Sequence, residues 1–389
     1  MAVNVQTGIG MVDIGSYKLG PQIPLFGVEH KAATRVETDG VEIVYLEKDG
    51  FEVTKPFFWW VWDYTLGKLL SAWVLFKSIR LIHRVLRERI AKAEGEIERK
   101  KLEQKLEALA GRKTRQPVLD WARRNFGPSV MTELFAIRTS GFNSGSVVMS
   151  HFCQNVACSQ ALDDVYNVTA SFGWEGIRMI PMVGQSDPLS RFHLDCPNGQ
   201  SVRNRYRIVA RLHEQLIRGE TLSVACGSAQ PLIHALSERK RQGALAGVSV
   251  LLADVDQSAI DLANHRAEQA GVRSVLIPLL TQFAVLPKAL EGTSFDHIEA
   301  CGIIDYLADD RVVDLAQMLH SKLKRGGTLL ISQMSKTRAE KVLSDTYNWW
   351  IIYRSPEQFA ALLRKAGFKD VTIYVEPWRV HMVALARKK

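Results

Sequence analysis

The chain has 389 residues, of which 47% are hydrophobic and 23% charged, a composition typical of a folded globular protein with room for more than one domain. Its five cysteines are odd in number and widely spaced, which argues against a disulfide framework and indicates a reducing compartment. No metal-ligand spacing stands out, and no secretory signal opens the chain, so we expect a cytoplasmic protein without a metal site.

The net charge of +9 is concentrated in one segment. Residues 77–115 hold thirteen Lys and Arg against six Glu, which leaves a net charge of only +2 for everything else. Because these basic residues alternate with glutamates in a helical pattern, we expect no nucleic acid partner.

Residues 1–55 alternate apolar and polar positions in short runs, and 41–46 in particular predicts a small strand. Residues 57–76 are rich in tryptophan and phenylalanine and about as long as a membrane span. Asp63 and Lys68 interrupt this stretch, so we do not expect a buried transmembrane helix there.

Residues 75–90 have helical periodicity, with aliphatic residues on one face and basic residues on another. An aromatic segment followed by a cationic amphipathic helix is typical of a membrane-surface contact, here on the inner face of the membrane. The alternative is an interdomain or homodimer-forming helix whose basic face is only solvated. A second exposed helix is predicted over 97–109, as an antiparallel hairpin with the first, and ends near Gly111.

Residues 201–217 predict an amphipathic helix, after which strands and helices alternate to the end of the chain. That alternation predicts an α/β fold with a parallel, Rossmann-like sheet. The predicted organisation is therefore a small β-containing segment (1–55), a mostly helical extension (56–116), a mixed substrate-side region assigned by elimination (117–200) and a cofactor-binding domain (201–389).

Two strand ends in this domain carry cofactor chemistry. The strand 221–226 leads into a turn of small residues at 227–229 and a helix opening near Gln230, which lets a ligand approach the backbone. The strand 248–254 ends in Asp254, a carboxylate able to accept both ribose hydroxyls of an adenosine. Asp256 is better explained as the N-cap of the next helix.

Residues 254–263 resemble the second-strand motif of class I S-adenosylmethionine-dependent methyltransferases, 295–307 their post-strand motif and 323–332 the glycine turn before their fifth strand. The resemblance covers about half of the chain and implies S-adenosylmethionine as cofactor. Carried over position by position, it assigns cofactor binding to Ala225, Cys226, Gly227, Ser228, Ala229, Asp254, Val255, Gln282, Cys301 and Gly302.

The first loop departs from the family pattern of an acid followed by three alternating glycines. Serine (Ser223) replaces the acid, and Ala225 and Ala229 replace two of the glycines. Alanine permits the close turn only with ordinary backbone angles, so we expect the methionine end of the cofactor to be held differently. Gln282 stands where the family often has an adenine-contacting acid.

Methyl transfer to a nitrogen or hydroxyl needs a base, whereas a carboxylate acceptor needs only orientation. The predicted catalytic residues are Asp305 and Tyr306, after the fourth strand, and His151, although a lone histidine is more often structural. Side chains predicted to bind substrate, each with a packing or solvated-surface alternative, are Arg203, Arg205, Trp349, Tyr353 and Arg354.

The aromatic and cationic segments favour an apolar, lipid-like acceptor. The arrangement loosely resembles bacterial enzymes that convert 3-hydroxy fatty acids to methyl-ester quorum-sensing signals. Alternatives are N- or O-methylation of a small polar metabolite or phospholipid amine, and a nucleic-acid-binding or regulatory protein with a relict methyltransferase fold.

Overall fold

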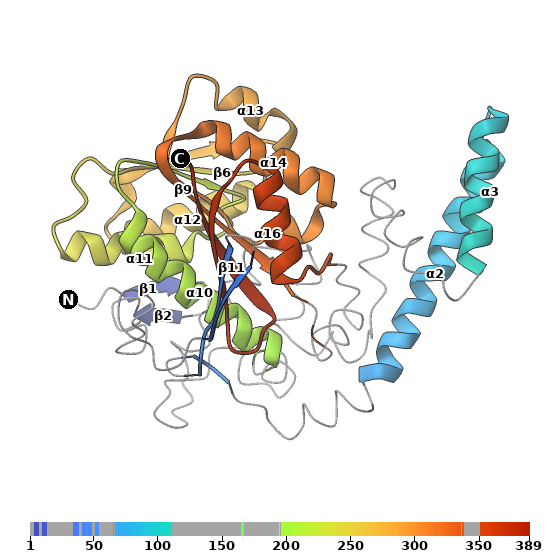
Figure 1. The fold of residues 1–389 in the computed structure, drawn as a ribbon, viewed down its shortest axis with the longest axis horizontal. Helices are drawn as coiled ribbons and strands as arrows, with labels where there is room; N and C mark the ends of the chain where they lie inside the picture. The colour runs from blue at the N-terminus through green and yellow to red at the C-terminus, as the bar shows by residue number, and fades with distance from the viewer. Residues whose placement is uncertain are drawn as a thin grey trace. The chain divides into compact units, whose positions relative to one another are not determined.

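A computed structural model gives the fold (Figure 1). The residues it describes are 4–7, 10–13, 34–38, 41–48, 51–53, 65, 67–110, 165–166, 194, 196–335, 337 and 351–389. Contacts divide the chain into two compact units, one made of residues 1–55, 146–337 and 351–389, the other of 56–145 and 338–350. Each unit is described by itself.

The first unit is built on a nine-stranded sheet with the order β3-β4-β10-β11-β9-β8-β5-β6-β7. Strands β5 to β9 pair in parallel, and β11 runs antiparallel between β9 and β10. The strands are β3 (Thr34–Thr38), β4 (Val41–Tyr45), β5 (Glu220–Val224), β6 (Ser249–Asp254), β7 (Leu276–Leu280), β8 (Phe295–Ala300), β9 (Leu323–Met334), β10 (Asp370–Val375) and β11 (His381–Arg387). A separate antiparallel pair joins β1 (Asn4–Thr7) and β2 (Gly10–Asp13).

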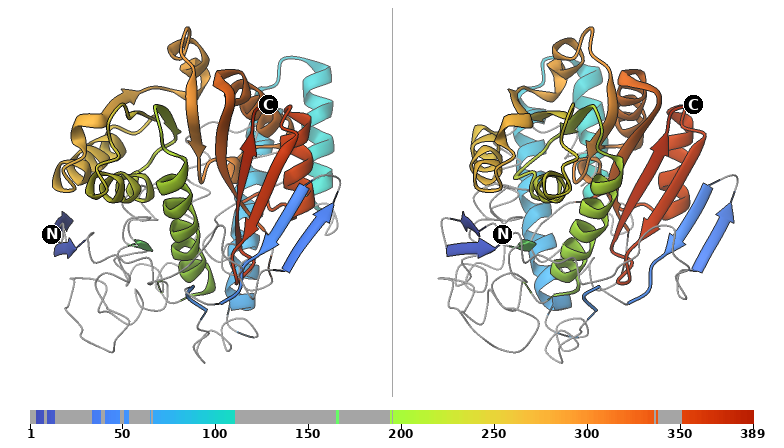
Figure 2. Two further views of the ribbon diagram at one scale, coloured as in Figure 1. Left: turned by 60° about the vertical axis from the view of Figure 1, so that its left-hand side comes forward. Right: turned by 90° about the vertical axis from the view of Figure 1, so that its left-hand side faces the viewer.

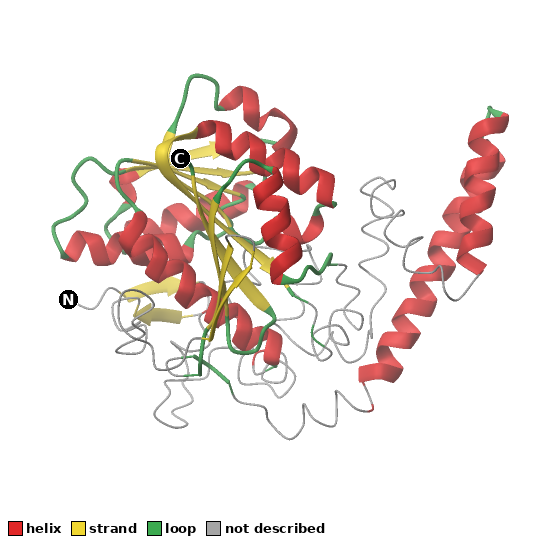
Figure 3. Cartoon of the chain, in the orientation of Figure 1, coloured by secondary structure: helices red, strands yellow, loops and turns green. Residues whose placement is uncertain are grey.

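Helices cover both faces of this sheet (Figure 3). Successive strand residues point to opposite faces, so Leu330 packs with α10, whereas Leu329 and Ile331 pack with α14 and α16. One face carries α10 (Pro197–Leu216), α11 (Gln230–Arg241) and α12 (Gln257–Gln269); the other carries α13 (Leu286–Ala289), α14 (Asp309–Lys322) and α16 (Pro356–Lys365). Short 3₁₀ turns are η3 (Arg273–Val275), η4 (Phe283–Val285) and η5 (Ile304–Tyr306).

This three-layer architecture confirms the predicted Rossmann-like α/β fold. The helix predicted over 201–217 is α10, which begins four residues earlier because Cys196 caps it by accepting the Gly199 N–H at 3.1 Å. The glycine turn predicted before the fifth strand differs: Gly326 and Gly327 lie within β9, beside a register shift against β8.

Strands β3 and β4 belong to the nine-stranded sheet rather than to a segment of their own. The predicted strand at 41–46 is β4, which pairs in parallel with β10 from Val41 opposite Val371 to Tyr45 opposite Val375. β3 pairs with β4 and forms the edge; Figure 2 shows both strands, in blue, beside the red β10. Residues 34–45 therefore extend the domain whose start the sequence places at residue 201.

The second unit contains the predicted helical hairpin. Its helices are α2 (Gly67–Lys92) and α3 (Glu96–Ala110), and Figure 1 shows α3 folded back along α2. Leu81, Ile82, Val85 and Leu86 are buried on one face of α2. Among the described helices, none is long and apolar enough to cross a bilayer.

Buried histidines in the first unit predict acid sensitivity. His234 lies on α11, and its Nδ1 forms a hydrogen bond with the Tyr206 hydroxyl at 2.8 Å. Burial lowers the pKa of its imidazole from 6.5 to about 4. Between pH 6.5 and pH 4 the unfolded chain therefore binds a proton at this histidine that the folded chain does not. The free energy of unfolding is unaffected by His234 above pH 6.5 and decreases as the pH falls toward 4.

We expect His234→Asn, which keeps an acceptor for Tyr206, to reduce the loss of unfolding free energy between pH 7 and pH 5 by about 2 kcal/mol. Urea unfolding at the two pH values measures this difference. His265→Asn, at an exposed position on α12, is the matched control and is expected to change nothing. Equal pH dependence in both variants would refute the prediction.

Candidate functional site

The loop between β5 and α11 keeps glycine-type backbone angles at three alternating positions. Ala225 has φ 52°, Gly227 φ 54° and Ala229 φ 48°. These are the left-handed angles that glycine adopts without cost, so the two alanines do not have the ordinary angles expected from the sequence. No heavy atom lies within 4 Å of the position a Cβ would take on Gly227, so the loop presents open space there.

Because a Cβ in the left-handed region costs about 1–2 kcal/mol, this loop is strained at both alanines. We expect Ala225→Gly and Ala229→Gly each to raise the free energy of unfolding by roughly 0.5–1 kcal/mol, after the greater entropy of the unfolded glycine variant is counted. Ala361→Gly, on the exposed side of α16, should instead lower it by about 1 kcal/mol. Urea denaturation measures all three, and losses of equal size would exclude strain in the loop.

Asp254, at the end of β6, is held against this loop. Its carboxylate accepts the Gly227 N–H at 2.9 Å through Oδ2 and the Asp256 N–H at 3.0 Å through Oδ1. The Asp256 side chain accepts the Ser258 N–H at 2.9 Å, which confirms its predicted role as N-cap of α12. Asp254 is thus the acid that faces the loop, while Asp256 serves the helix.

The loops after β6 and β7 meet beside Asp254, because the Thr281 N–H donates to the Asp254 carbonyl at 2.8 Å. This contact brings Gln282 next to the end of β6, as the predicted adenine contact requires. Two large apolar side chains here are exposed to solvent: Val255 at 66% and Phe283 at 44%. Phe283 is not among the residues predicted from the sequence, although an aromatic residue directly after Gln282 was a signal for it.

The strand order reverses between β5 and β8, which is where α/β sheets bind ligands. Ser223 on β5 donates to Glu299 on β8 at 2.6 Å, so a carboxyl group of the neighbouring strand lies against the first loop's serine. Burial raises the pKa of Glu299, and the Ser223 hydrogen bond opposes that rise. Just beyond, the Gly302 N–H donates to the Ser332 hydroxyl at 3.0 Å.

The two cysteines of the site are neutral thiols. Burial raises the pKa of Cys226 and Cys301 well above the ordinary value, and the negative charge of Glu299 acts in the same direction on both. Neither is an activated nucleophile, since that requires a lowered pKa. Their predicted part in cofactor binding stays a prediction.

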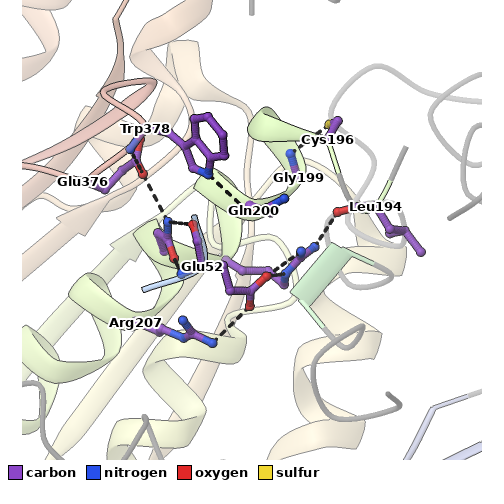
Figure 4. A network of polar contacts seen from close by, with 10 residues as sticks. Glu52, Leu194, Cys196, Gly199, Gln200, Arg207, Glu376 and Trp378 are labelled. Atoms are coloured by element: carbon purple, nitrogen blue, oxygen red, sulfur yellow. Dashed lines mark hydrogen bonds and ion pairs between the residues drawn. The ribbon is translucent and has the colours of Figure 1, made fainter. Parts of the chain in front are cut away.

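A buried network fixes α10 and with it the arginines of this helix (Figure 4). The Arg203 and Arg207 guanidinium groups both bind the Glu52 carboxylate, at 2.6 Å and 3.0 Å. Asn204 donates to the Glu52 carbonyl at 2.9 Å and to Glu376 at 3.2 Å. Arg203 therefore links α10 to Glu52. Its contact with substrate stays a prediction.

Arg205 differs from its two neighbours on the helix. Its side chain is 95% buried, and within the described residues no carboxylate lies within the 4.0 Å of an ion pair. Nη2 donates to the Tyr166 hydroxyl at 3.1 Å, and Nη1 lies 3.8 Å from the position of a Cβ on Gly302. A buried cation without an ion-paired carboxylate, next to the switch point of the sheet, can bind an anionic group of a ligand.

Asp305 and Arg354 brace the loop after β8. Asp305 accepts the Met334 N–H at 2.6 Å and the Gln333 amide at 2.8 Å, both through Oδ1. Burial raises its pKa to about 6, against the opposing influence of the Met334 hydrogen bond, Arg205 and Arg354. Arg354 directs its donors to Asp309, Gln333 and the carbonyls of Ile304 and Leu307. Its contacts serve this loop, and substrate binding by Arg354 stays a prediction.

The structure therefore brings most of the predicted cofactor residues to the carboxyl end of β5, β6 and β8, with Arg205 and Asp305 beside them. Tyr306 lies in η5 next to Asp305, and Tyr353 precedes Arg354. His151 and Trp349 lie outside the described residues. The catalytic roles of Tyr306 and His151 and the substrate-binding roles of Trp349 and Tyr353 stay predictions.

No protein-family model and no curated protein sequence matches the chain. Among solved structures it is similar to a possible exported protein of Bordetella parapertussis (17% identity, TM-score 0.49), over 82% of this chain and 96% of that one. It is also similar to an O-methyltransferase family protein of Burkholderia thailandensis (13%, 0.41; 62% and 71%). A third similar chain is magnesium protoporphyrin IX methyltransferase of Synechocystis with bound SAH (14%, 0.39; 49% and 87%).

Proposed function

We propose that this chain is an S-adenosylmethionine-dependent methyltransferase. The observation that carries the proposal is the hydrogen bond from the Gly227 N–H to the Asp254 carboxylate. Gly227 lies in the loop between β5 and α11, in which three residues have left-handed φ angles. A ribose binds to a carboxylate at such a strand end, and an open loop of small residues accepts the rest of the ligand. Exposed Val255 and Phe283 give an adenine two apolar surfaces beside it.

The proposed acceptor is the carboxylate of an apolar molecule, with a 3-hydroxy fatty acid as the best specific choice. When bound, S-adenosylmethionine supplies an activated methyl group. Arg205 would hold the acceptor carboxylate at the switch point and orient one of its oxygens. A carboxylate is already deprotonated at neutral pH and needs no base.

A pair of histidines between α10 and β8 offers no base, as an acceptor of this kind allows. His213 and His297 are fully enclosed and bond to each other at 3.1 Å, and burial lowers the pKa of both imidazoles. A histidine that is neutral but sealed from solvent cannot take a proton from a ligand. Orientation by Arg205 is then the main task of the protein.

Asp305 favours a second candidate, methylation of a hydroxyl or amine. Its pKa of about 6 is close to neutral pH, which suits a general base. Both hydrogen bonds given above use Oδ1, so Asp305→Asn keeps an acceptor for the Met334 N–H. For a carboxylate acceptor this variant keeps its turnover, whereas a hydroxyl or amine acceptor would lose about 10²–10⁴-fold.

The proposal is tested in two steps with the full chain. Calorimetry with S-adenosylmethionine measures cofactor binding, and no binding would reject the methyltransferase assignment. Incubation with the cofactor and a series of 3-hydroxy fatty acids, followed by mass spectrometry, then looks for the methyl ester. Cofactor binding without any methyl ester would reject the acceptor and leave the methyltransferase proposal standing.

A further inference from the structure

The exposed face of α2 carries large apolar side chains at one end and arginines at the other. Leu69, Trp73 and Phe76 are 71%, 42% and 55% exposed. One to three turns further along, Arg80 and Arg87 are exposed, and the side chain of Arg84 is 61% exposed. With 3.6 residues per turn, all six positions fall within about 80° of one another around the helix.

The opposite side of α2 is occupied. Ser78, Leu81, Ile82, Val85 and Leu86 are buried, so the helix already has a covered apolar face. The residues on the exposed face are therefore not needed for that covered face. Solvent-exposed Leu, Trp and Phe in one stripe are uncommon on a protein surface and mark a contact site.

Two cation–π contacts join the apolar end to the basic end. The Lys77 ammonium lies 4.9 Å from the centre of the Trp73 ring, and the Arg80 guanidinium lies 5.6 Å from that of Phe76. The arginines also line a hollow of about 510 Å³ together with Ile79, His83 and Glu88. Arg84 lies 4.0 Å from Glu88, the acidic residue among them.

We propose that this stripe, the α2 stripe (Leu69, Trp73, Phe76, Arg80, Arg84 and Arg87), docks the protein on an anionic phospholipid bilayer. The surface of a bilayer presents acyl chains and phosphates within about 10 Å of depth, so it offers a partner both to the apolar part and to the arginine part of the stripe. Tryptophan and leucine enter that boundary, while the arginines pair with lipid phosphates. A purely electrostatic partner would give no role to Leu69, Trp73 and Phe76.

The test is flotation of the full chain with phosphatidylcholine vesicles that contain 30% phosphatidylglycerol. We expect binding at low salt, at least tenfold weaker binding at 0.5 M salt, and little binding to pure phosphatidylcholine. The triple variant Arg80→Gln/Arg84→Gln/Arg87→Gln should bind on the order of 100-fold more weakly. The double variant Trp73→Ser/Phe76→Ser should lose at least tenfold.

The neighbouring helix α3 offers matched controls. Lys100→Gln/Lys101→Gln/Lys105→Gln removes the same charge, and Ile97→Ser removes an apolar side chain that is 74% exposed. Binding of these controls should stay within threefold of the unaltered chain, with circular dichroism to confirm that every variant folds. Equal losses in the α2 and α3 variants would overturn the proposal, because they would show attraction by net charge alone.

Two further outcomes would also overturn it. Failure of the unaltered chain to float with anionic vesicles would exclude a lipid surface. A dimer that dissociates in the Trp73→Ser/Phe76→Ser variant, seen by light scattering without lipid, would identify a second copy of the chain as the occupant. Neither result depends on methyl transfer, so both are distinguishable from failure of the proposed function.

Discussion

Replacement of Arg205 by methionine is expected to raise the KM for a carboxylate acceptor by about 30-fold or more. Loss of one partner from a buried charged hydrogen-bonded pair costs about 2–5 kcal/mol. Within the described residues Arg205 has no ion-paired carboxylate, but its charge opposes the rise that burial causes in the pKa of the Glu299 and Asp305 carboxyls, so circular dichroism of the free variant must first confirm that it folds. Methyl-ester formation against acceptor concentration gives the KM.

Arg211→Met is the control for this experiment. Arg211 lies on the same helix, but its side chain is 40% exposed and pairs with Glu214 three residues away. We expect the loss of this pair to leave the acceptor KM unchanged. The acceptor assignment predicts that Arg205→Met leaves the affinity for S-adenosylmethionine within threefold of the original. If cofactor affinity falls instead and the acceptor KM does not rise, Arg205 binds the cofactor's own carboxylate and the assignment to the acceptor is wrong.

The second large effect is expected at Asp254. Asp254→Asn should weaken S-adenosylmethionine binding by about 100-fold or more, since each hydrogen bond from a ribose hydroxyl to a charged group contributes about 1.5–3 kcal/mol. The variant also sets an amide N–H against a backbone donor, the N–H of Gly227 or of Asp256. Calorimetric titration of the cofactor measures the loss.

Asp256→Asn is a matched control two residues away. Its side chain caps α12 by accepting the Ser258 N–H, and asparagine caps a helix about as well as aspartate does. Cofactor affinity should therefore stay unchanged in this variant. An equal loss at both positions would mean that the whole loop, rather than the Asp254 carboxylate, responds to the substitution, and the ribose assignment would fail.

In the first loop, the structure brings together features that the sequence alone does not show. Ser223 replaces an acid, and the structure places the Glu299 carboxylate 2.6 Å from its hydroxyl. Ala225 and Ala229 replace glycines and still adopt left-handed angles. Neither feature is visible along the chain, because Glu299 is 76 residues from Ser223 and a φ angle follows from packing.

Local signals predicted the elements well wherever a pattern and its end fell within a few residues. The strand that ends at Asp254, the cap at Asp256 and the helix after it form such a unit, and the structure confirms all three. The helix from Pro356 begins with an equally local signal, since Ser355 and Gln358 form a capping box. Hydrogen bonds within one turn of chain decide these features, so the sequence suffices for them.

Long-range contacts decided the rest. Strand β4 could be predicted from its alternating residues, but its place beside β10 depends on a pairing across more than 300 residues. Arg203, Arg205 and Arg207 are equivalent in sequence; only the tertiary structure shows that two of them bind Glu52 while Arg205 faces Gly302.

The sequence by itself thus determined the alternating α/β pattern of the C-terminal half, the acid at the end of its second strand and the amphipathic α2. Each of these follows from side-chain periodicity and local hydrogen bonding. The tertiary structure alone decided that β3 and β4 extend the sheet, that Glu299 lies against Ser223 and that Arg205 is buried beside Gly302. These depend on which distant segments meet, and no local interaction energy specifies that.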